Sequence, residues 1–146
     1  MTPLEAAKRK CPMDERERFA KLYDVILDIF KSYMANFVWT AGLFSLAIGW
    51  FISSDSGRAF IRNSRIAFVG AVLVLGIITL VHTVSCWWYY RRSQETIAQI
   101  SREYDDLQPL PYRHYEIRPS VLIGNLLVNW TLAAGLVAFL VAARTS

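Results

Sequence analysis

The sequence predicts an all-α, polytopic membrane protein with three transmembrane helices, the first two forming an antiparallel hairpin that extends into a cytoplasmic helical stalk. Three observations support this prediction. Hydrophobic residues make up 54% of the 146 residues and gather in three blocks. Each block lacks Asp, Glu, Lys and Arg over more than the roughly 18 residues that a helix needs to cross a bilayer. Aromatic and basic residues border the blocks, as they do at membrane–water interfaces.

The chain divides into consecutive segments, of which residues 13–107 form the predicted hairpin. In order they are a flexible N-terminal tail (1–12), a cytoplasmic helix (14–32), a first transmembrane helix (33–53), a second one (66–90), its cytoplasmic extension (91–107), a proline-rich return loop (108–119) and a third transmembrane helix (120–143).

An N-terminal capping sequence and the absence of a helix-breaking proline predict the first long helix. Asp14 and Glu17 have the spacing of a capping box, and no proline follows before the end of the first apolar block. The first half has apolar residues at three- and four-residue spacing, which is typical of an amphipathic helix. The second half carries no charge after Lys31, and Trp39 and Trp50 lie near its two ends.

The second long helix begins after a short polar link, residues 54–65, in which we expect a turn. Its apolar block is the longest in the chain, and it ends in the interfacial sequence Trp87-Trp88-Tyr89-Tyr90-Arg91-Arg92. No Gly or Pro interrupts the continuation, which carries an apolar stripe with the 3-4-3 spacing of a coiled-coil seam. The stripe consists of Ile97, Ile100, Tyr104 and Leu107.

The two cytoplasmic extensions predict a stalk. At ~1.5 Å per residue, Ile97 lies about as far from the membrane edge as Ile26, so the two apolar stripes can pair over roughly 25 Å. The alternative places the N-terminal helix flat on the membrane surface. Pro109 and Pro111 end the extension, and the aromatic segment 112–115 is expected to anchor at the interface.

The distribution of Lys and Arg predicts the orientation. Seven lie in the N-terminal segment and five in residues 91–118, against three in the 54–65 link and one at Arg144. The positive-inside rule therefore places the N-terminus in the cytoplasm and the C-terminus outside, in the plasma or inner membrane of the cell. The first thirty residues mix both charge signs, so no cleavable signal peptide is expected.

Polar residues inside the second and third spans lie on single helical faces. They are Thr79, His82, Thr83 and Cys86 in the second span, and Asn125 and Asn129 in the third. Counted from the cytoplasmic ends, Asn129 reaches the depth of His82 and Asn125 that of Cys86, which predicts a shared polar layer that Ser45 can join. Such residues act as interhelical hydrogen-bonding groups or, alternatively, line a polar path or form a ligand site.

Two faces of small residues predict close helix packing, because small side chains at four-residue steps let helices approach. The first span carries Ala41, Ser45, Gly49 and Ser53, and the third carries Ala134, Ala138 and Ala142. The alanine face lies roughly opposite the asparagine face of the third span. One face can pack on the hairpin while the other meets a neighbouring chain.

These features predict a non-enzymatic membrane protein: an accessory subunit, or a homo-oligomeric assembly protein, whose stalk engages a membrane-protein partner. The sequence has no catalytic set, zinc spacing or phosphate loop, so no cofactor or metal is expected. Acidic residues interleave the basic ones, which disfavours nucleic-acid binding. The alternatives are an oligomeric pore, channel or effector whose polar helix faces line a conduit, and a membrane redox subunit that uses His82.

Overall fold

The computed structural model describes residues 15–103 and 114–145, and this part contains helices and no strand. The helices are α2 (Glu15–Ser53), α3 (Asp55–Asn63), α4 (Arg65–Glu103) and α5 (Pro119–Thr145). Within the described residues, α2, α4 and α5 are long and apolar enough to span a membrane. The structure thus confirms the prediction of an all-α chain with three such helices. The tail, Tyr104, Leu107 and residues 108–113, which are half of the return loop, lie outside the described residues.

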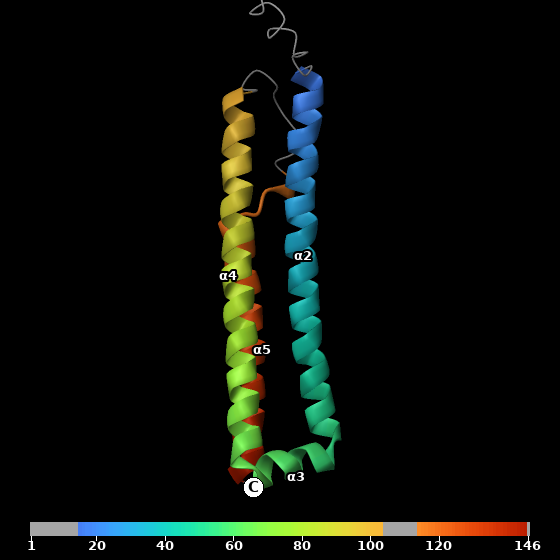
Figure 1. Cartoon of the computed structure of the whole chain (residues 1–146), viewed down its shortest axis with the longest axis vertical. Coiled ribbons are helices and arrows are strands. Elements are labelled where there is room, and N and C mark those ends of the chain that lie inside the picture. The colour runs from blue at the N-terminus through green and yellow to red at the C-terminus, as the bar shows by residue number, and fades with distance from the viewer. Residues whose placement is uncertain (1–14, 104–113, 146) are drawn as a thin grey trace, which may run out of the picture.

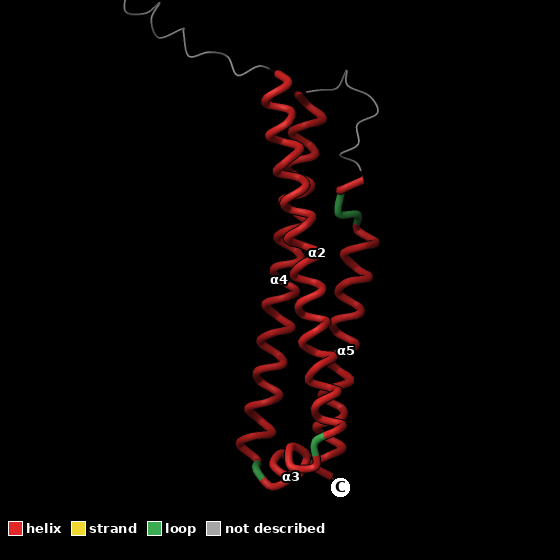
Figure 2. The backbone as a smooth tube through the Cα atoms, turned by 90° about the vertical axis from the view of Figure 1, so that its right-hand side faces the viewer, coloured by secondary structure: helices red, strands yellow, loops and turns green. Residues whose placement is uncertain are grey.

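The molecule is elongated, with α2 and α4 running antiparallel beside each other (Figures 1 and 2). The third long helix, α5, packs against both of them over the part of the molecule that ends at the C-terminus. At that end the short helix α3 crosses from α2 to α4 and contacts all three long helices. At the opposite end α2 and α4 continue beyond the start of α5 (Figure 2).

The link between α2 and α4 is a helix, so the expectation of a simple turn at residues 54–65 is wrong. Ser54 lies between α2 and α3, and its side chain accepts a hydrogen bond from the backbone N–H of Gly57 at 3.1 Å. Ser64 lies between α3 and α4, and its side chain accepts from the N–H of Ala67 at 3.2 Å. Each serine therefore caps the helix that follows it, which makes two sharp corners without proline.

Helix α3 is amphipathic, which fixes how it lies against the bundle. Its buried residues are Gly57 and Ile61, while the Phe60 side chain is 64% exposed. A Cβ atom at Gly57 would lie 2.9 Å from a carbon of the Trp50 indole and 3.0 Å from the Ser54 hydroxyl. The absence of a side chain at this position therefore lets α3 approach the last turn of α2 closely.

The core consists of three clusters stacked along the long axis. The largest joins all four helices near α3, and its buried members are Phe44, Phe51, Ile61, Leu75, Ala133, Leu136 and Leu140. A middle cluster contains Ile29, Tyr33, Cys86, Ile117 and Leu122. The third lies where α2 and α4 run beyond α5, and is centred on Ile26 and Ile100. Large apolar side chains elsewhere on the three long helices are exposed, as a lipid-facing surface requires.

The segment that leads into α5 is packed against the bundle. Ile117 is 1% exposed, its N–H faces the Ser93 hydroxyl at 3.5 Å, and its carbonyl accepts from the Gln94 side chain at 3.2 Å. Tyr115 makes edge-to-face ring contacts with Tyr23 at 6.0 Å and with Phe30 at 5.6 Å. Tyr115 is thus a packing residue against α2, where the sequence suggested anchoring at the lipid interface.

Candidate polar site between the helices

Five of the six polar-layer residues are buried where α4 and α5 meet. His82 is 3% exposed, Asn125 is 7% exposed, and Asn129 and Cys86 are fully buried, as is nearly all of Thr79. Thr83 is half-buried. Helical periodicity explains the arrangement, because residues three and four apart share one face of a helix. The structure therefore brings the polar faces of α4 and α5 together.

The side-chain amide of Asn125 is the centre of this layer. Its Oδ1 accepts a hydrogen bond from His82 Nε2 at 3.2 Å and another from Asn129 Nδ2 at 2.9 Å. Cys86 Sγ lies 3.3 Å from the same histidine nitrogen. Asn129 Nδ2 also donates to the backbone carbonyl of Asn125 at 3.1 Å. One carbonyl oxygen thus links the two helices through its contact with His82.

The register between α4 and α5 differs from the expected one by a helical turn, because His82 pairs with Asn125 instead of lying level with Asn129. Ile117 is fixed level with Ser93 and Gln94. The chain is not helical from Glu116 to Arg118, and α5 begins at Pro119. A non-helical segment can advance farther per residue than the ~1.5 Å of an α-helix, so α5 begins deeper than a helical count predicts.

The two threonines bond within α4. Thr79 donates to the carbonyl of Leu75, and Thr83 donates to the carbonyl of Thr79, each at 2.8 Å. Ser45 does the same within α2, donating to Ala41, and it is exposed. Hydroxyl groups in a helix often satisfy themselves on the preceding turn in this way. Ser45 therefore does not join the layer, and the threonine hydroxyls make no cross-helix bond in the described structure.

Helix α2 supplies two polar residues that the sequence analysis did not include. Tyr33 is fully buried, and its hydroxyl donates to the carbonyl of Val121 at 3.4 Å. Asn36 donates to Cys86 Sγ at 3.9 Å. Both follow the three- and four-residue spacing of the apolar stripe that contains Ile29, which is the signal that could have identified them. All three spans therefore contribute to the polar layer.

The layer is only partly satisfied by hydrogen bonds. Within the described residues, three of its buried side-chain atoms have no hydrogen-bond partner: His82 Nδ1, Asn125 Nδ2 and Asn129 Oδ1. Buried polar atoms are normally paired, so these carry a cost in an apolar medium. Two of them, an amide nitrogen and an amide oxygen, are a donor and an acceptor on neighbouring turns of α5.

The chemistry available at this layer is narrow. His82 and Cys86 offer two ligand atoms, whereas a zinc site takes three or four protein ligands. The described residues contain no group of three or more His, Cys, Asp or Glu side chains placed to hold a metal ion. The fully buried Cys86 thiol is also shielded from solutes. What the geometry supplies is a set of hydrogen bonds that joins three helices.

The small-residue faces lie on the outside of the bundle. On α2, Ser45, Gly49 and Ser53 are exposed and Ala41 is half-buried. On α5, Ala134, Ala138 and Ala142 are exposed. Helix α5 therefore turns its asparagines inward and its alanines outward. The packing of the three long helices on one another uses neither small-residue face in full.

Comparison of the chain with protein-family models, with curated proteins and with solved structures finds no match.

Proposed function

We propose that the protein is a non-enzymatic membrane assembly subunit that engages a partner protein through a cytoplasmic stalk. The stalk comprises residues 15–32 of α2 and 91–103 of α4. The observation that carries the proposal is the burial of Ile26 and Ile100, which are 1% and 0% exposed in this region. The two helices thus share an apolar core in this region, to which Tyr115 also contributes.

The charge pattern supports an aqueous location for this paired region. Lys31, Arg91 and Arg92 lie at the ends of the uncharged blocks of α2 and α4. Beyond them, exposed charges of both signs cover the helices, including Glu17 and Lys21 as an i,i+4 ion pair at 3.2 Å. Such a surface is costly in hydrocarbon and ordinary in water. The positive-inside rule favours the cytoplasm for this side.

The contacts of Tyr115 and Ile117 support a stalk that stands off the membrane. Both pack against the paired helices just before α5 begins. Tyr115 contacts Tyr23 and Phe30 on the face of α2 that also meets α4. A helix lying flat on the lipid would turn this apolar face toward the membrane. The return segment instead occupies it, which favours the stalk.

Self-association is the second part of the proposal. The exposed small-residue faces of α2 and α5 are the surfaces on which a second copy can pack closely in lipid. The pore alternative needs the polar faces to line a conduit between copies. His82, Asn125 and Asn129 are instead buried within one chain and bonded to each other, so a conduit built on them would first have to open the bundle.

The test uses Ile100→Asp, which places a charge in the stalk core. In affinity purification from mild detergent, we expect partner recovery to fall at least tenfold while the amount inserted in the membrane stays the same. Ala98→Asp is the matched control, because Ala98 lies on the same helix and is exposed. This variant should recover the partner like the native chain.

Two outcomes would contradict the proposal. Unchanged recovery with Ile100→Asp would show that the stalk core does not support partner binding. A native mass equal to one chain, with no co-purified protein, would remove both the partner and the self-association.

A further inference from the structure

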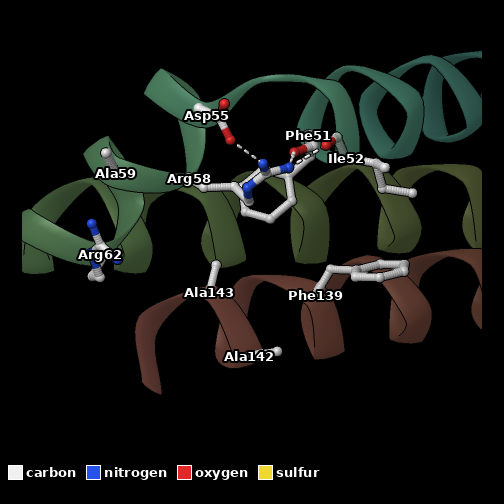
Figure 3. Close-up of a pocket in the computed structure, with 9 residues that line it drawn as sticks. All are labelled: Phe51, Ile52, Asp55, Arg58, Ala59, Arg62, Phe139, Ala142 and Ala143. Atoms are coloured by element: carbon white, nitrogen blue, oxygen red, sulfur yellow. Dashed lines mark hydrogen bonds and ion pairs between the residues drawn. The ribbon is translucent and has the colours of Figure 1, made fainter. Parts of the chain in front are cut away.

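A cavity of about 640 Å³ lies where α2, α3 and α5 meet, at the end of the molecule opposite the stalk (Figure 3). Its volume falls within the range of ~300–1,000 Å³ that is typical of small-molecule sites. Phe51 and Ile52 of α2 and Phe139 and Ala142 of α5 supply apolar walls. Arg58 and Arg62 of α3 supply two guanidinium groups. The cavity is therefore amphipathic.

The position of the cavity explains why it has apolar walls on α2 and α5 and basic side chains on α3. Phe51 and Ile52 belong to the last turn of α2, and Ala142 lies near the end of α5, where the uncharged blocks finish. The α3 residues come directly after the first of these blocks. The apolar walls therefore lie at the level of the lipid chains, and the arginines at the level of the lipid headgroups.

The two arginines differ in their hydrogen-bond and ion-pair partners within the protein. Arg58 donates to the backbone carbonyls of Phe51 and Ile52 and forms an ion pair with Asp55 (Figure 3). It thereby satisfies carbonyl groups at the C-terminus of α2. Arg62 is exposed and makes no hydrogen bond or ion pair within the described part of the chain. Arg62 thus places one unpaired positive charge at the rim of the cavity.

Another arginine near this end, Arg144, does not compete for the same ligand. The guanidinium of Arg144 lies over the Phe68 ring at 5.0 Å, on the side of α4. It does not line the cavity. The uncompensated charge that faces the cavity therefore comes from Arg62.

We propose that this cavity binds one anionic phospholipid, with its phosphate on Arg62 and the start of one acyl chain between Phe51 and Phe139. Arginine suits phosphate because its planar group donates two parallel hydrogen bonds. The bilayer presents a phosphate and an acyl chain together at this depth. A zwitterionic lipid carries no net charge to balance Arg62, so the site selects for an anionic headgroup.

An apolar groove on the other face of α3 provides an internal comparison. It has a volume of about 460 Å³, lies between α2 and α4, and includes Leu43, Val74 and Phe60 in its walls. Among the described residues, no charged side chain lines it. This groove is expected to bind the acyl chains of any phospholipid, whatever its headgroup. A preference of the protein for an anionic headgroup would therefore come from the cavity beside Arg62.

The test measures lipid retention by the full chain. The protein is purified in mild detergent, mixed with equal amounts of phosphatidylglycerol and phosphatidylcholine, and examined by native mass spectrometry. We expect one phosphatidylglycerol per chain, retained at least tenfold over phosphatidylcholine. Arg62→Gln should reduce this preference to within about twofold. Arg65→Gln is the matched control, because Arg65 is exposed at the same end and does not line the cavity.

A second variant tests the acyl-chain part of the site. Ala142→Phe places an aromatic ring in the space for the acyl chain and should also abolish the preference for phosphatidylglycerol. Excess inorganic phosphate, in contrast, should leave the bound lipid in place. Equal retention of the two lipids by the native chain, or an unchanged preference in Arg62→Gln, would show ordinary lipid contact and overturn the proposal. Displacement by inorganic phosphate would show a free-anion site and overturn it as well.

Discussion

At the scale of single residues, Asn125 links α5 to α4. Its Oδ1 receives hydrogen bonds from His82 of α4 and from Asn129 of its own helix, so together with the contacts of Ile117 it favours one rotation and one height of α5 against α4. Leucine and alanine side chains elsewhere in the interface can slide by a turn with little loss, because lipid is as apolar as they are. The hydrogen bond between Asn125 and His82 is directional, so it would be lost if α5 moved by one turn.

The bond between His82 and Asn125 should be measurable as a coupling energy. In reversible unfolding in micelles, the cycle of His82→Ala, Asn125→Ala and the double variant should give a coupling of about 0.6 to 1.7 kcal/mol. Asn125→Ala should cost more than Asn129→Ala, because the former removes the acceptor that two residues share.

The control for this cycle is Asn63→Ala, since Asn63 is exposed on α3 and far from the layer. It should change the free energy of unfolding by less than about 0.5 kcal/mol. A coupling of zero between His82 and Asn125 would contradict the hydrogen bond as the link between α4 and α5.

At the scale of elements, the corners on either side of α3 depend on two serine caps, Ser54 for α3 and Ser64 for α4. Ser54 and Ser64 each bond to the backbone N–H three residues on, which otherwise has no partner in the first turn of a helix. These corners set the distance between the outer ends of α2 and α4. They also place Arg58 where it can reach the carbonyls of Phe51 and Ile52.

Removing either cap should loosen the corner that it makes. We expect Ser54→Ala and Ser64→Ala each to lower the free energy of unfolding by about 1 kcal/mol. Hydrogen exchange should accelerate at the Gly57 amide in the first variant and at the Ala67 amide in the second.

Ser53→Ala is the matched control, because the Ser53 hydroxyl donates back to carbonyls of its own helix and caps nothing. It should leave both amides as they are in the native chain. Equal acceleration in Ser53→Ala would mean that the corner depends on general packing and not on the caps.

The same elements show what the sequence could and could not predict. Charge-free length alone identifies the three long helices, because an uncharged block of that size has few other stable locations. The helix in the link was missed because Ser54, Asp55, Ser56 and Gly57 are as typical of a turn as of a helix start. The register of α5 was missed by a turn because it depends on Ile117, whose contacts with Ser93 and Gln94 no periodicity reveals.

At the scale of the whole molecule, the two ends differ in charge and in construction. One end carries the paired extensions of α2 and α4, with exposed charges of both signs. The other end is closed by α3, which brings Arg58, Arg62 and a single acidic residue, Asp55, to the ends of the spans. Three helices long and apolar enough to span a membrane separate the two ends, and each proposal above concerns only one of them.

The orientation can be tested by cysteine labelling in intact cells. The starting chain carries Cys11→Ser and keeps Cys86, which is fully buried and should not react. Ser56→Cys on α3 should react with a membrane-impermeant maleimide added outside. Ala98→Cys on the stalk should react only after the cells are permeabilised. Both positions are exposed, so side-chain burial cannot account for a difference between them.

The labelling pattern connects topology to the partner proposal. Twelve of the sixteen Lys and Arg residues belong to the segments that the sequence predicts to be cytoplasmic, and retention of basic segments in the cytoplasm is the physical basis of the expected pattern. The reverse pattern, with Ala98→Cys labelled from outside, would place the stalk in the extracytoplasmic space. A cytoplasmic partner would then be impossible, and Arg62 would face the inner leaflet. Ala98→Cys is therefore the variant whose result decides between the two orientations.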